Sequence, residues 1–464
     1  MTADCDIAVI GAGISGLTAA FNLGRRGFSV HVFEASSRAG GVIGTEREAG
    51  VLYERGPNSI LDTSPRINEL LDDLGIRGER IDASAISAKR FIVRNGRLVA
   101  LPMSPPAFLG SPLFSPRAKL RLLGEPFVRR APPHEEETVA QFVLRRLGRE
   151  FLDYAIEPFV AGIYAGDPRQ LSLCAAFPRL HALEQRYGSL ILGQIRGARE
   201  RGRRAETSKR VAGSFSFHNG MQTLTDALAR AVPELHRDTR AMAIRRDADG
   251  SFVVSLQGRD GLARCRARAV VLATPADCAA TLLRSAASDA AAALDAIPYA
   301  PVVTLASTYR RADVTHPLDG FGFLAPKAER RRILGTLFSS SMFAGRAPED
   351  TVLLTTYLGG QRDPDMVARS DEELGGVVHA EMSALIGARA AMQFCAVTRW
   401  ARAIPQYTLG HAERIRRAES AERQLPGLFL CASYRGGVAV GDCIQSGYRM
   451  AEAVTRYLQS AAPP

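Results

Sequence analysis

Glycine residues near the start of the chain are spaced to hold a phosphate group. The run Gly11-Ala12-Gly13-Ile14-Ser15-Gly16 follows an apolar stretch and opens a segment with helical spacing. In this setting the first glycine permits a tight turn, the second lets the backbone approach a pyrophosphate, and the third allows close helix packing. The free N–H groups at the start of the helix favour negative charge. Glu34, at the end of the next apolar stretch, is placed to accept hydrogen bonds from ribose hydroxyls. We therefore expect a dinucleotide site, with a purely structural glycine turn as the alternative.

A second glycine-rich stretch comes soon after Glu34. Arg38-Ala39-Gly40-Gly41 could bring backbone N–H groups and a guanidinium onto the same pyrophosphate. This Arg-x-Gly-Gly extension resembles that of the flavin amine oxidase superfamily, which favours FAD over NAD. Towards the other end, an expected strand at Leu428–Ala432 followed by Gly441-Asp442 is similar to the superfamily's second FAD segment. The resemblance implies that both ends of the chain close over one FAD.

Longer strings narrow the resemblance to the protoporphyrinogen oxidases. The most specific are Gly162–Asp167, Ile404–His411 and Ala432–Ile444. Others that agree with them are Gly56–Ser59, Gly320–Pro326 and Leu334–Ser341. The resemblance runs nearly end to end, and these strings look closer to the plastid and myxobacterial branch of the family than to the mitochondrial one.

The resemblance implies an FAD enzyme of porphyrin and haem biosynthesis that removes six electrons from protoporphyrinogen IX, passes them to oxygen and releases hydrogen peroxide. A flavin that accepts hydride needs no nucleophilic side chain, and the sequence shows neither a Ser/His/Asp signature nor His or Cys residues at metal-ligand spacing. We therefore expect no catalytic side chain and no metal. The alternatives are coproporphyrinogen III oxidation by the same fold, an amine oxidase or carotenoid desaturase, and, outside the enzymes, a prenyl-binding escort protein.

Several residues match the family's substrate positions. Arg90 aligns with an arginine that binds a propionate, a role that suits a planar guanidinium; an ordinary exposed cation is the alternative. The residues expected to line the macrocycle, or to let the backbone approach it, are Phe321, Gly322, Leu324, Leu337, Tyr357, Gly162 and Gly359. Apolar and aromatic side chains suit a flat tetrapyrrole, although each could also be a core residue or a structural turn.

The residues expected to contact FAD form a longer set. Trp400, the only tryptophan, corresponds to a cofactor-side position in bacterial relatives, with core packing as the alternative, and Ala241 lies where a strand meets the adenine end. His411 is expected to be structural or to orient the cofactor rather than to act as a base. The full set is Gly11, Ala12, Gly13, Ile14, Ser15, Gly16, Glu34, Arg38, Gly40, Gly41, Val42, Gly56, Pro57, Asn58, Ser59, Ala241, Trp400, Val438, Ala439, Val440 and Asp442. We expect non-covalent binding, because no Cys or His is positioned for flavin attachment; Cys431 and Cys443 are the residues that could contradict this.

Strands and helices must position these residues. Apolar runs predict strands at 6–10 and 28–33 on either side of a helix at 15–26, which makes a βαβ start. Further strands are expected at 214–218, 241–244, 252–256, 269–273, 302–309, 352–357 and 428–432, and a closing helix at 442–458. The prediction is an α/β fold with a discontinuous Rossmann-like FAD-binding domain (1–80, 211–275 and 395–464), a mixed-sheet substrate domain (81–91 and 276–394) and a helical, membrane-associating insertion (92–210).

Length, charge and cysteine usage limit the classes of protein further. The 464 residues, 46% hydrophobic and 23% charged, can form two or three domains with real cores. The net charge of +11 suits nucleic acid, acidic lipid or an anionic small molecule, and charge alone does not choose among them. The resemblance favours the porphyrinogen and no nucleic acid. Seven scattered cysteines without a C-x-x-C pair indicate neither a zinc site nor a disulfide framework, which suits a reducing compartment.

Any membrane contact is expected to be peripheral. No apolar run has the length of a membrane-spanning helix, and the first residues lack the pattern of a secretory signal. In the family the helical insertion rests on the membrane, and here Phe108, Leu109 and Phe114 are expected to be exposed on it. The basic run 196–210 favours a solvated loop over a phosphate or lipid contact. We expect a cytoplasmic protein peripherally associated with the inner membrane, with a homodimer left open.

Overall fold

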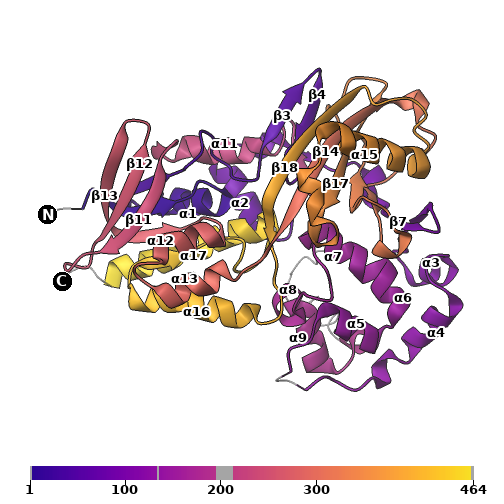
Figure 1. Cartoon of the computed structure of the whole chain (residues 1–464), viewed down its shortest axis with the longest axis horizontal. Coiled ribbons are helices and arrows are strands. Elements are labelled where there is room, and N and C mark those ends of the chain that lie inside the picture. The colour runs from indigo at the N-terminus through magenta and orange to yellow at the C-terminus, as the bar shows by residue number, and fades with distance from the viewer. Residues whose placement is uncertain (1–2, 133–134, 195–212, 461–464) are drawn as a thin grey trace.

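Two β-sheets lie side by side, and a helical segment sits next to the second (Figure 1). The computed structural model describes residues 3–132, 135–194 and 213–460. The basic run 196–210 lies outside these residues. No helix among the described residues is long and apolar enough to cross a membrane.

The first sheet contains the βαβ start. Its strand order is β10-β2-β1-β13-β12-β11, with β19 paired to β13. Strands β10, β2, β1, β19 and the end of β13 are parallel, whereas β11, β12 and β13 form an antiparallel meander. The bounds are β1 (Cys5–Ile10), β2 (Val30–Phe33), β10 (Glu234–His236), β11 (Arg240–Arg246), β12 (Phe252–Gly258), β13 (Gly261–Leu272) and β19 (Leu428–Leu430).

Helices cover both faces of the first sheet, which explains why β1 is apolar on both sides. One core contains Ile7 and Val9 and the helices α1 (Ile14–Gly24), α2 (Pro65–Asp73), α11 (Gln222–Ala231) and α17 (Val440–Ser460). The other contains Ala8 and Ile10 and the helices α12 (Ala276–Leu283), α13 (Ser288–Asp295) and α16 (His411–Gln424). The expected Rossmann-like arrangement is confirmed.

The second sheet has the order β18-β14-β17-β16-β15-β7-β8. The strands of this sheet are β7 (Phe91–Arg94), β8 (Arg97–Ala100), β14 (Tyr299–Arg310), β15 (Gly322–Leu324), β16 (Gly335–Leu337), β17 (Thr351–Gly359) and β18 (Phe394–Pro405). Helix α15 (Asp371–Ile386) packs on one face through Leu374, Val378 and Met382. The other face is turned away from α15 and carries the expected substrate residues.

Short strands and turns connect the two sheets. Strands β3 (Thr45–Glu48) and β4 (Val51–Glu54) form a hairpin. Strands β5 (Ile60–Leu61), β9 (Ser214–Phe217) and β6 (Arg80–Asp82) form a small antiparallel sheet. Helix α14 (Ser339–Met342) follows β16.

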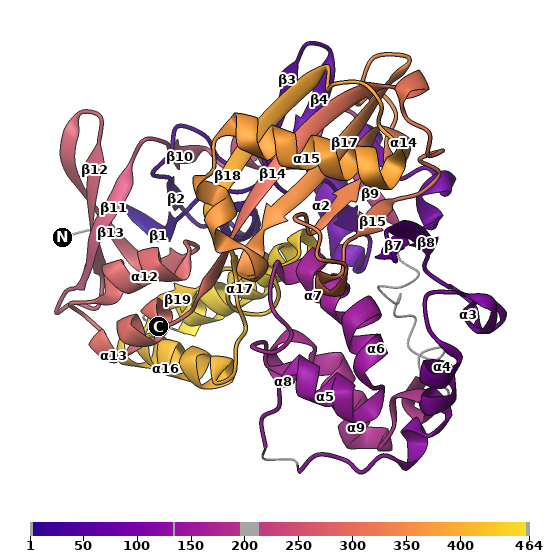
Figure 2. The same ribbon diagram turned by 45° about the vertical axis from the view of Figure 1, so that its right-hand side comes forward.

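The helical segment lies beneath the second sheet (Figure 2). It comprises α3 (Pro105–Gly110), α4 (Pro116–Leu123), α5 (Val139–Arg146), α6 (Arg149–Phe151), a short π-helix (Leu152–Ile156), α7 (Glu157–Tyr164), α8 (Leu173–Ala176) and α9 (Pro178–Tyr187). Prolines open α3, α4 and α9, where the missing N–H has no helical partner to lose. Arg146 on α5 is fully buried and connects the helices of this segment. It donates hydrogen bonds to Glu125, after α4, and to Glu184 on α9, at 2.7 Å each.

One expectation about this segment is wrong. Phe114 is not exposed: it is 4% accessible and stacks on Phe151, with ring centroids 4.4 Å apart. Phe108 is partly buried against the same rings. Leu109, in contrast, is 70% exposed as expected.

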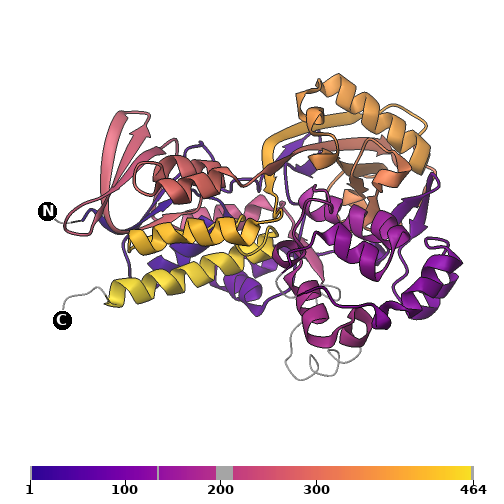
Figure 3. The ribbon, with the colours of Figure 1, turned by 60° about the horizontal axis from the view of Figure 1, so that its bottom comes forward.

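Some elements lie outside the segments expected to contain them. Strand β18 belongs to the second sheet although residues 395–464 were expected in the FAD-binding domain, and α12 and α13 pack on the first sheet although 276–394 were expected in the other. Strand β8 extends the second sheet from within the range expected to be helical. The threefold division stays a proposal, and these contacts would move its boundaries. Figure 3 shows the helical segment beside the second sheet.

Candidate active site

The glycine turn forms as the sequence predicts. It leaves β1 at Gly11, which has a φ of +102° and where a Cβ would lie 2.8 Å from the Ala273 carbonyl oxygen, so a side chain is excluded. A Cβ on Gly16 would lie 2.1 Å from the Gly11 oxygen, so this glycine lets α1 start directly against the turn. A Cβ on Gly13, in contrast, would meet nothing within 4 Å. The N-terminus of α1 therefore faces open space, as an incoming pyrophosphate requires.

Glu34 supports this turn from the end of β2. Its Oε2 accepts a hydrogen bond from the Ala12 N–H at 2.8 Å, and its Oε1 accepts from the N–H and the hydroxyl of Ser36. The Thr239 N–H donates to the Glu34 carbonyl oxygen at 2.8 Å, which places the start of β11, and with it Ala241, near this carboxylate. The position fits the expected ribose contact.

The Arg-x-Gly-Gly stretch folds back onto the glycine turn. The Gly40 N–H donates to the Ala12 carbonyl oxygen at 2.8 Å, and Gly13 pairs with Gly40 in a short parallel bridge. The Arg38 guanidinium donates to the carbonyl oxygens of Ala39, Gly41 and Ile43. Arg38 thus holds its own loop in shape, and contact with a phosphate stays a prediction. Burial and the neighbouring Arg55 lower the pKa of this guanidinium.

The segment Gly56–Ser59 joins the glycine turns to the second sheet. A Cβ on Gly56 would lie 2.2 Å from the Val42 carbonyl oxygen, so these two stretches touch. The Asn58 amide donates to the Tyr357 hydroxyl at 2.8 Å. Burial raises the pKa of Tyr357, which keeps the phenol neutral. Asn58 therefore fixes the expected cofactor side relative to the expected substrate side.

Trp400 makes a second connection of the same kind. Its indole N–H donates to the Arg55 carbonyl oxygen at 2.8 Å, and the Arg55 guanidinium lies 5.9 Å from its ring. On β18 it pairs with Val302 of β14. The side chain is half-buried between the sheet and the segment after β4, which agrees with a cofactor-side position and leaves the contact itself a prediction.

The C-terminal segment approaches the same region. After β19 the chain turns at Gly436 and Gly437 and enters α17 at Val440. Tyr407 holds this turn, because its hydroxyl donates to the Ser433 carbonyl oxygen and accepts from the Gly437 N–H at 3.1 Å. Tyr407 lies within a string that marks the resemblance, yet its type and spacing gave no sign of this role. The expected contacts Val438 and Ala439 lie between the turn and α17, and Val438 packs on the core of the helical segment.

Strand register places most of the expected substrate residues on one face. Gly322 pairs with Leu337, and Leu337 with Thr355; Leu324 pairs with Gly335, and Gly335 with Tyr357. Residues paired across antiparallel strands share a face, and so do residues two apart on one strand. Leu324, Leu337 and Tyr357 therefore lie on the face away from α15, and Trp400 and Gly359 join them through Val302. The glycine at 322 is required there, since a Cβ would lie 2.1 Å from the Thr336 oxygen.

Helix α7 closes this face on the side of the helical segment. A Cβ on Gly162 would lie 3.0 Å from Leu324 Cδ2, so only a small residue lets the helix approach so near. Gly359, at the end of β17, has a φ of +91° and turns the chain out of the sheet. Both glycines thus shape the edge of the face.

Arg90 stands at the other edge of the face. It precedes β7, where Ile92 pairs with Leu324, so alternation places Arg90 on the same side. Its guanidinium lies 5.1 Å from the Phe321 ring and, among the described residues, has no hydrogen-bond or ion-pair partner. Lys89, next to it, is paired with Asp319. Arg90 is exposed, and partial desolvation by its neighbours lowers the pKa of its guanidinium. It is a free cation beside an apolar surface.

His411 is buried and structural. Its ring stacks on Tyr407 at 4.2 Å, and its Nε2 lies 2.9 Å from the Tyr434 carbonyl oxygen. Burial lowers its pKa to about 4. The ring is held by these contacts against the neighbouring turn, and its structural or cofactor-orienting role stays a prediction.

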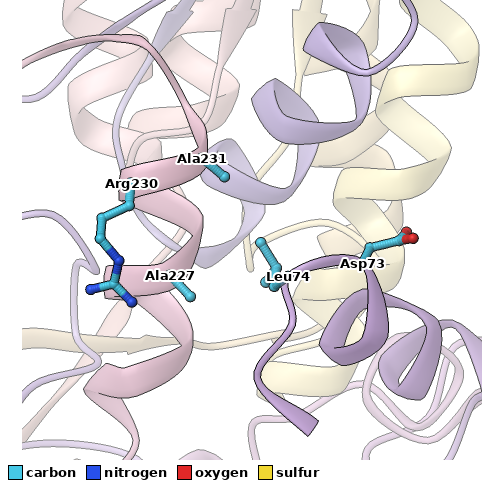
Figure 4. Close-up of a pocket in the computed structure, with 5 residues that line it drawn as sticks. All are labelled: Asp73, Leu74, Ala227, Arg230 and Ala231. Atoms are coloured by element: carbon cyan, nitrogen blue, oxygen red, sulfur yellow. The ribbon is translucent and has the colours of Figure 1, made fainter.

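A shallow pocket elsewhere on the molecule has no part in this arrangement. It lies between α2 and α11 and is lined by Asp73, Leu74, Ala227, Arg230 and Ala231 (Figure 4). None of these is an expected site residue. The candidate site is instead the region where the glycine turns, the segment Gly56–Ser59 and the face of the second sheet meet.

The residues brought together here fit a flavin dinucleotide, and a family comparison decides the class. A model of flavin-containing amine oxidoreductases matches residues 14–455. The chain belongs to this family. The flavin oxidoreductase is 35% identical to the mitochondrial protoporphyrinogen oxidase of Nicotiana tabacum, over 98% of this chain and 96% of the relative. It is 27% identical to the coproporphyrinogen III oxidase of Bacillus subtilis, over 98% of each chain.

The fold agrees with this membership. A solved structure of a candidate protoporphyrinogen oxidase from Exiguobacterium sp. 255-15 superposes with a TM-score of 0.82, at 24% identity, over 99% of this chain and 100% of that one. The family match and the sequence relatives make the protein an FAD-dependent oxidoreductase. Its FAD would be held by the glycine turn, Glu34, the Arg38–Val42 loop, the segment Gly56–Ser59 and the start of α17.

Proposed function

We propose that this flavin oxidoreductase converts protoporphyrinogen IX to protoporphyrin IX with oxygen as the electron acceptor. The observation that carries the proposal is an apolar sheet face with Arg90 at its edge, a cation that has no partner among the described residues. Leu324, Leu337 and Tyr357 offer a flat surface to a macrocycle, and Arg90 offers a partner to a propionate. The names of the relatives support the same substrate.

The reaction removes six electrons and six protons from the porphyrinogen, and three oxygen molecules become three molecules of hydrogen peroxide. Bound FAD supplies the hydride acceptor. The chain's own residues bind and orient. Arg90 fixes one end of the substrate, the face of β15, β16 and β17 holds the ring, and Asn58 keeps that face in position relative to the cofactor loops.

No side chain of the described residues is assigned as a base. His411 is neutral and engaged with Tyr434, and the phenol of Tyr357 accepts a hydrogen bond and keeps its proton. Protons lost from the substrate nitrogen atoms pass to solvent in this proposal. Asn58 and Tyr357 act by holding geometry.

The charges around the face bear on the choice of porphyrinogen. A coproporphyrinogen carries four carboxylates where protoporphyrinogen carries two. Among the described residues at this edge, Arg90 is unpaired whereas Lys89 is occupied by Asp319. One free cation suits the substrate with fewer carboxylates better.

A steady-state assay with both porphyrinogens tests the proposal. Oxygen uptake and porphyrin fluorescence would be followed with each substrate at matched concentrations. We expect a higher kcat/KM for protoporphyrinogen IX. A higher value for coproporphyrinogen III would reassign the substrate, and turnover of neither by the yellow holoenzyme would overturn the proposal.

We further propose that the helical segment rests on an anionic bilayer. Leu109, Leu120, Leu123 and Phe127, which is 89% exposed, place bulky apolar side chains in solvent on α3, α4 and the turn after them. Arginines flank them: Arg117, Arg121, Arg129 and Arg130 are all exposed. Apolar anchors beside cations are the combination that binds acidic lipid surfaces.

A further inference from the structure

Two cysteines and a histidine meet on three neighbouring strands of the first sheet. Cys5 begins β1, Cys265 lies on β13, and His31 lies on β2. The two sulfur atoms are 3.6 Å apart, and one ligand atom from each of the three side chains lies within 4.8 Å of the others. Both cysteines are only 4% exposed, and both are free thiols.

The sheet order explains this meeting. Strand β1 lies between β2 and β13, so residues far apart in sequence become neighbours. Cys5 pairs with Ala267, two residues from Cys265, and His31 pairs with Ala8.

A fourth polar group lies next to His31. The ring of His236 on β10 has its centroid 5.4 Å from that of His31 and stacks on Phe33. Its Nε2 is buried, makes no hydrogen bond among the described residues, and lies 3.6 Å from Oε2 of Glu234.

The spacing of the sulfur atoms has a chemical meaning. Tetrahedral zinc with Zn–S bonds of about 2.3 Å holds its two sulfur ligands about 3.8 Å apart. The observed 3.6 Å is close to this value. It is far longer than the roughly 2.05 Å of a disulfide bond.

We propose that Cys5, Cys265 and His31 form a zinc(II) site, with the fourth position open to water. Binding replaces two thiol protons with one zinc ion and releases them to solvent, with no change of oxidation state. Cys5 begins β1, whereas the glycine turn follows the last residue of β1, about 17 Å along the strand. Zinc would therefore tie three strands together away from the redox site.

Metal analysis of the holoenzyme tests this proposal. The protein would be incubated with zinc chloride, freed of loose metal by gel filtration, and measured by elemental mass spectrometry and zinc K-edge X-ray absorption. We expect about one zinc per chain, bound by two sulfur atoms. The variant Cys265→Ser should lower zinc retention by about tenfold or more, whereas Cys278→Ser, an exposed cysteine on α12, should not.

Other outcomes overturn the proposal. Absence of retained zinc, equal loss in the two variants, or an absorption spectrum without sulfur ligands would each do so. A chain lighter by two hydrogen atoms, with no metal, would show a disulfide in place of the site. If Cys265→Ser does not fold, His31→Gln, on a half-buried position, gives the same comparison.

Discussion

At the scale of single residues, Arg90 is the clearest test of how the substrate binds. Arg90→Ala removes the unpaired cation at the edge of the apolar face, so a propionate would lose its partner. We expect KM for protoporphyrinogen IX to rise by about tenfold or more, with FAD content unchanged. A misoriented ring would also lower kcat, whereas loss of uniform binding alone would leave it intact.

The conservative change Arg90→Lys is the matched control. An ammonium group keeps the charge but cannot present two parallel N–H donors to a carboxylate, so the rescue should be partial. An unaltered kcat/KM in Arg90→Ala would remove Arg90 from the substrate site.

Glu34 belongs to the cofactor side and gives a separate prediction. Glu34→Ala removes the acceptor for the Ala12 N–H and for the ribose hydroxyls. We expect FAD to bind more weakly by about 1.5–3 kcal/mol, roughly ten- to a hundredfold in Kd. Titration of the apoprotein with FAD, followed by flavin fluorescence, measures this.

Glu34→Gln serves as the control for Glu34→Ala. It keeps one acceptor oxygen, so its affinity for FAD should lie between that of the wild type and that of Glu34→Ala. Equal affinity in all three would place Glu34 outside the cofactor site.

The buried ring of His411 predicts a pH dependence of stability. Its pKa is lowered to about 4 in the folded protein, against about 6.5 in an unfolded chain. Between these values the unfolded state binds the extra proton, so the stabilising effect is present above pH 6.5 and is lost as the pH falls towards 4. From pH 7 to pH 5 the expected loss is about 2 kcal/mol.

The variant His411→Gln isolates that effect, because glutamine can still donate to the Tyr434 carbonyl oxygen but does not titrate. Buried Glu54 contributes with the opposite sign, since burial raises its pKa to about 7, and it does so equally in both proteins. The measured quantity is the difference in unfolding free energy between wild type and variant at pH 7 and at pH 5. A difference that does not change with pH would contradict the assignment.

At the scale of elements, α1 and α17 cross at Gly447. A Cβ there would lie 2.7 Å from Thr18 Cβ and 2.8 Å from the Ser15 carbonyl oxygen. Gly447→Ala should push the helices apart and destabilise the protein by roughly 1–3 kcal/mol. It should also weaken FAD binding, because Ser15 belongs to the glycine turn.

The exposed Gly376 in the interior of α15 is the control for this crossing. A Cβ on it meets nothing within 4 Å, so Gly376→Ala should stabilise the helix by about 1 kcal/mol. Thermal unfolding of the two variants and the wild type measures these changes in stability. If Gly447→Ala were as stable as Gly376→Ala, the close crossing would be wrong.

The elements also show what the sequence could and could not predict. Contacts within a short stretch of chain determine the turn around Gly11 and Gly16 and the position of Glu34. The spacing of these residues was therefore sufficient to predict them. Phe114 was assigned wrongly because an apolar residue among prolines gives no sign of a partner such as Phe151. The meeting of Cys5 with Cys265 was missed because it depends on which strand lies next to β1, and cysteine spacing along the chain carries no such information.

At the scale of the whole molecule, membrane binding depends on where the exposed apolar side chains lie. Leu123→Glu combined with Phe127→Glu places two negative charges on the proposed lipid-facing side of the helical segment. We expect binding to anionic liposomes at low ionic strength to fall by about tenfold or more, because both apolar burial and charge attraction are reduced. Co-sedimentation with the liposomes measures it.

A matched variant at the far end of the molecule controls for general effects of charge. Leu262→Glu, on the hairpin between β12 and β13, alters an apolar residue that is 85% exposed. This variant should bind anionic liposomes as well as the wild-type protein does. If the wild-type protein ignores anionic liposomes at low salt, the proposed membrane contact fails.

The pairing of β14 and β18 has a consequence for movement. These antiparallel strands are twelve residues each and run side by side along the second sheet. The start of β14 lies beside the end of β18, where the Gln406 N–H donates to the Pro298 carbonyl oxygen. Hydrogen-bonded ribbons resist bending within their own plane and yield across it. The register shift between Ala300 and Val302 marks where such yielding would concentrate. We therefore expect the first and second sheets to rotate relative to each other about a hinge at this register shift. This rotation would change the distance between the face that carries Tyr357 and the cofactor loops, without a sideways translation.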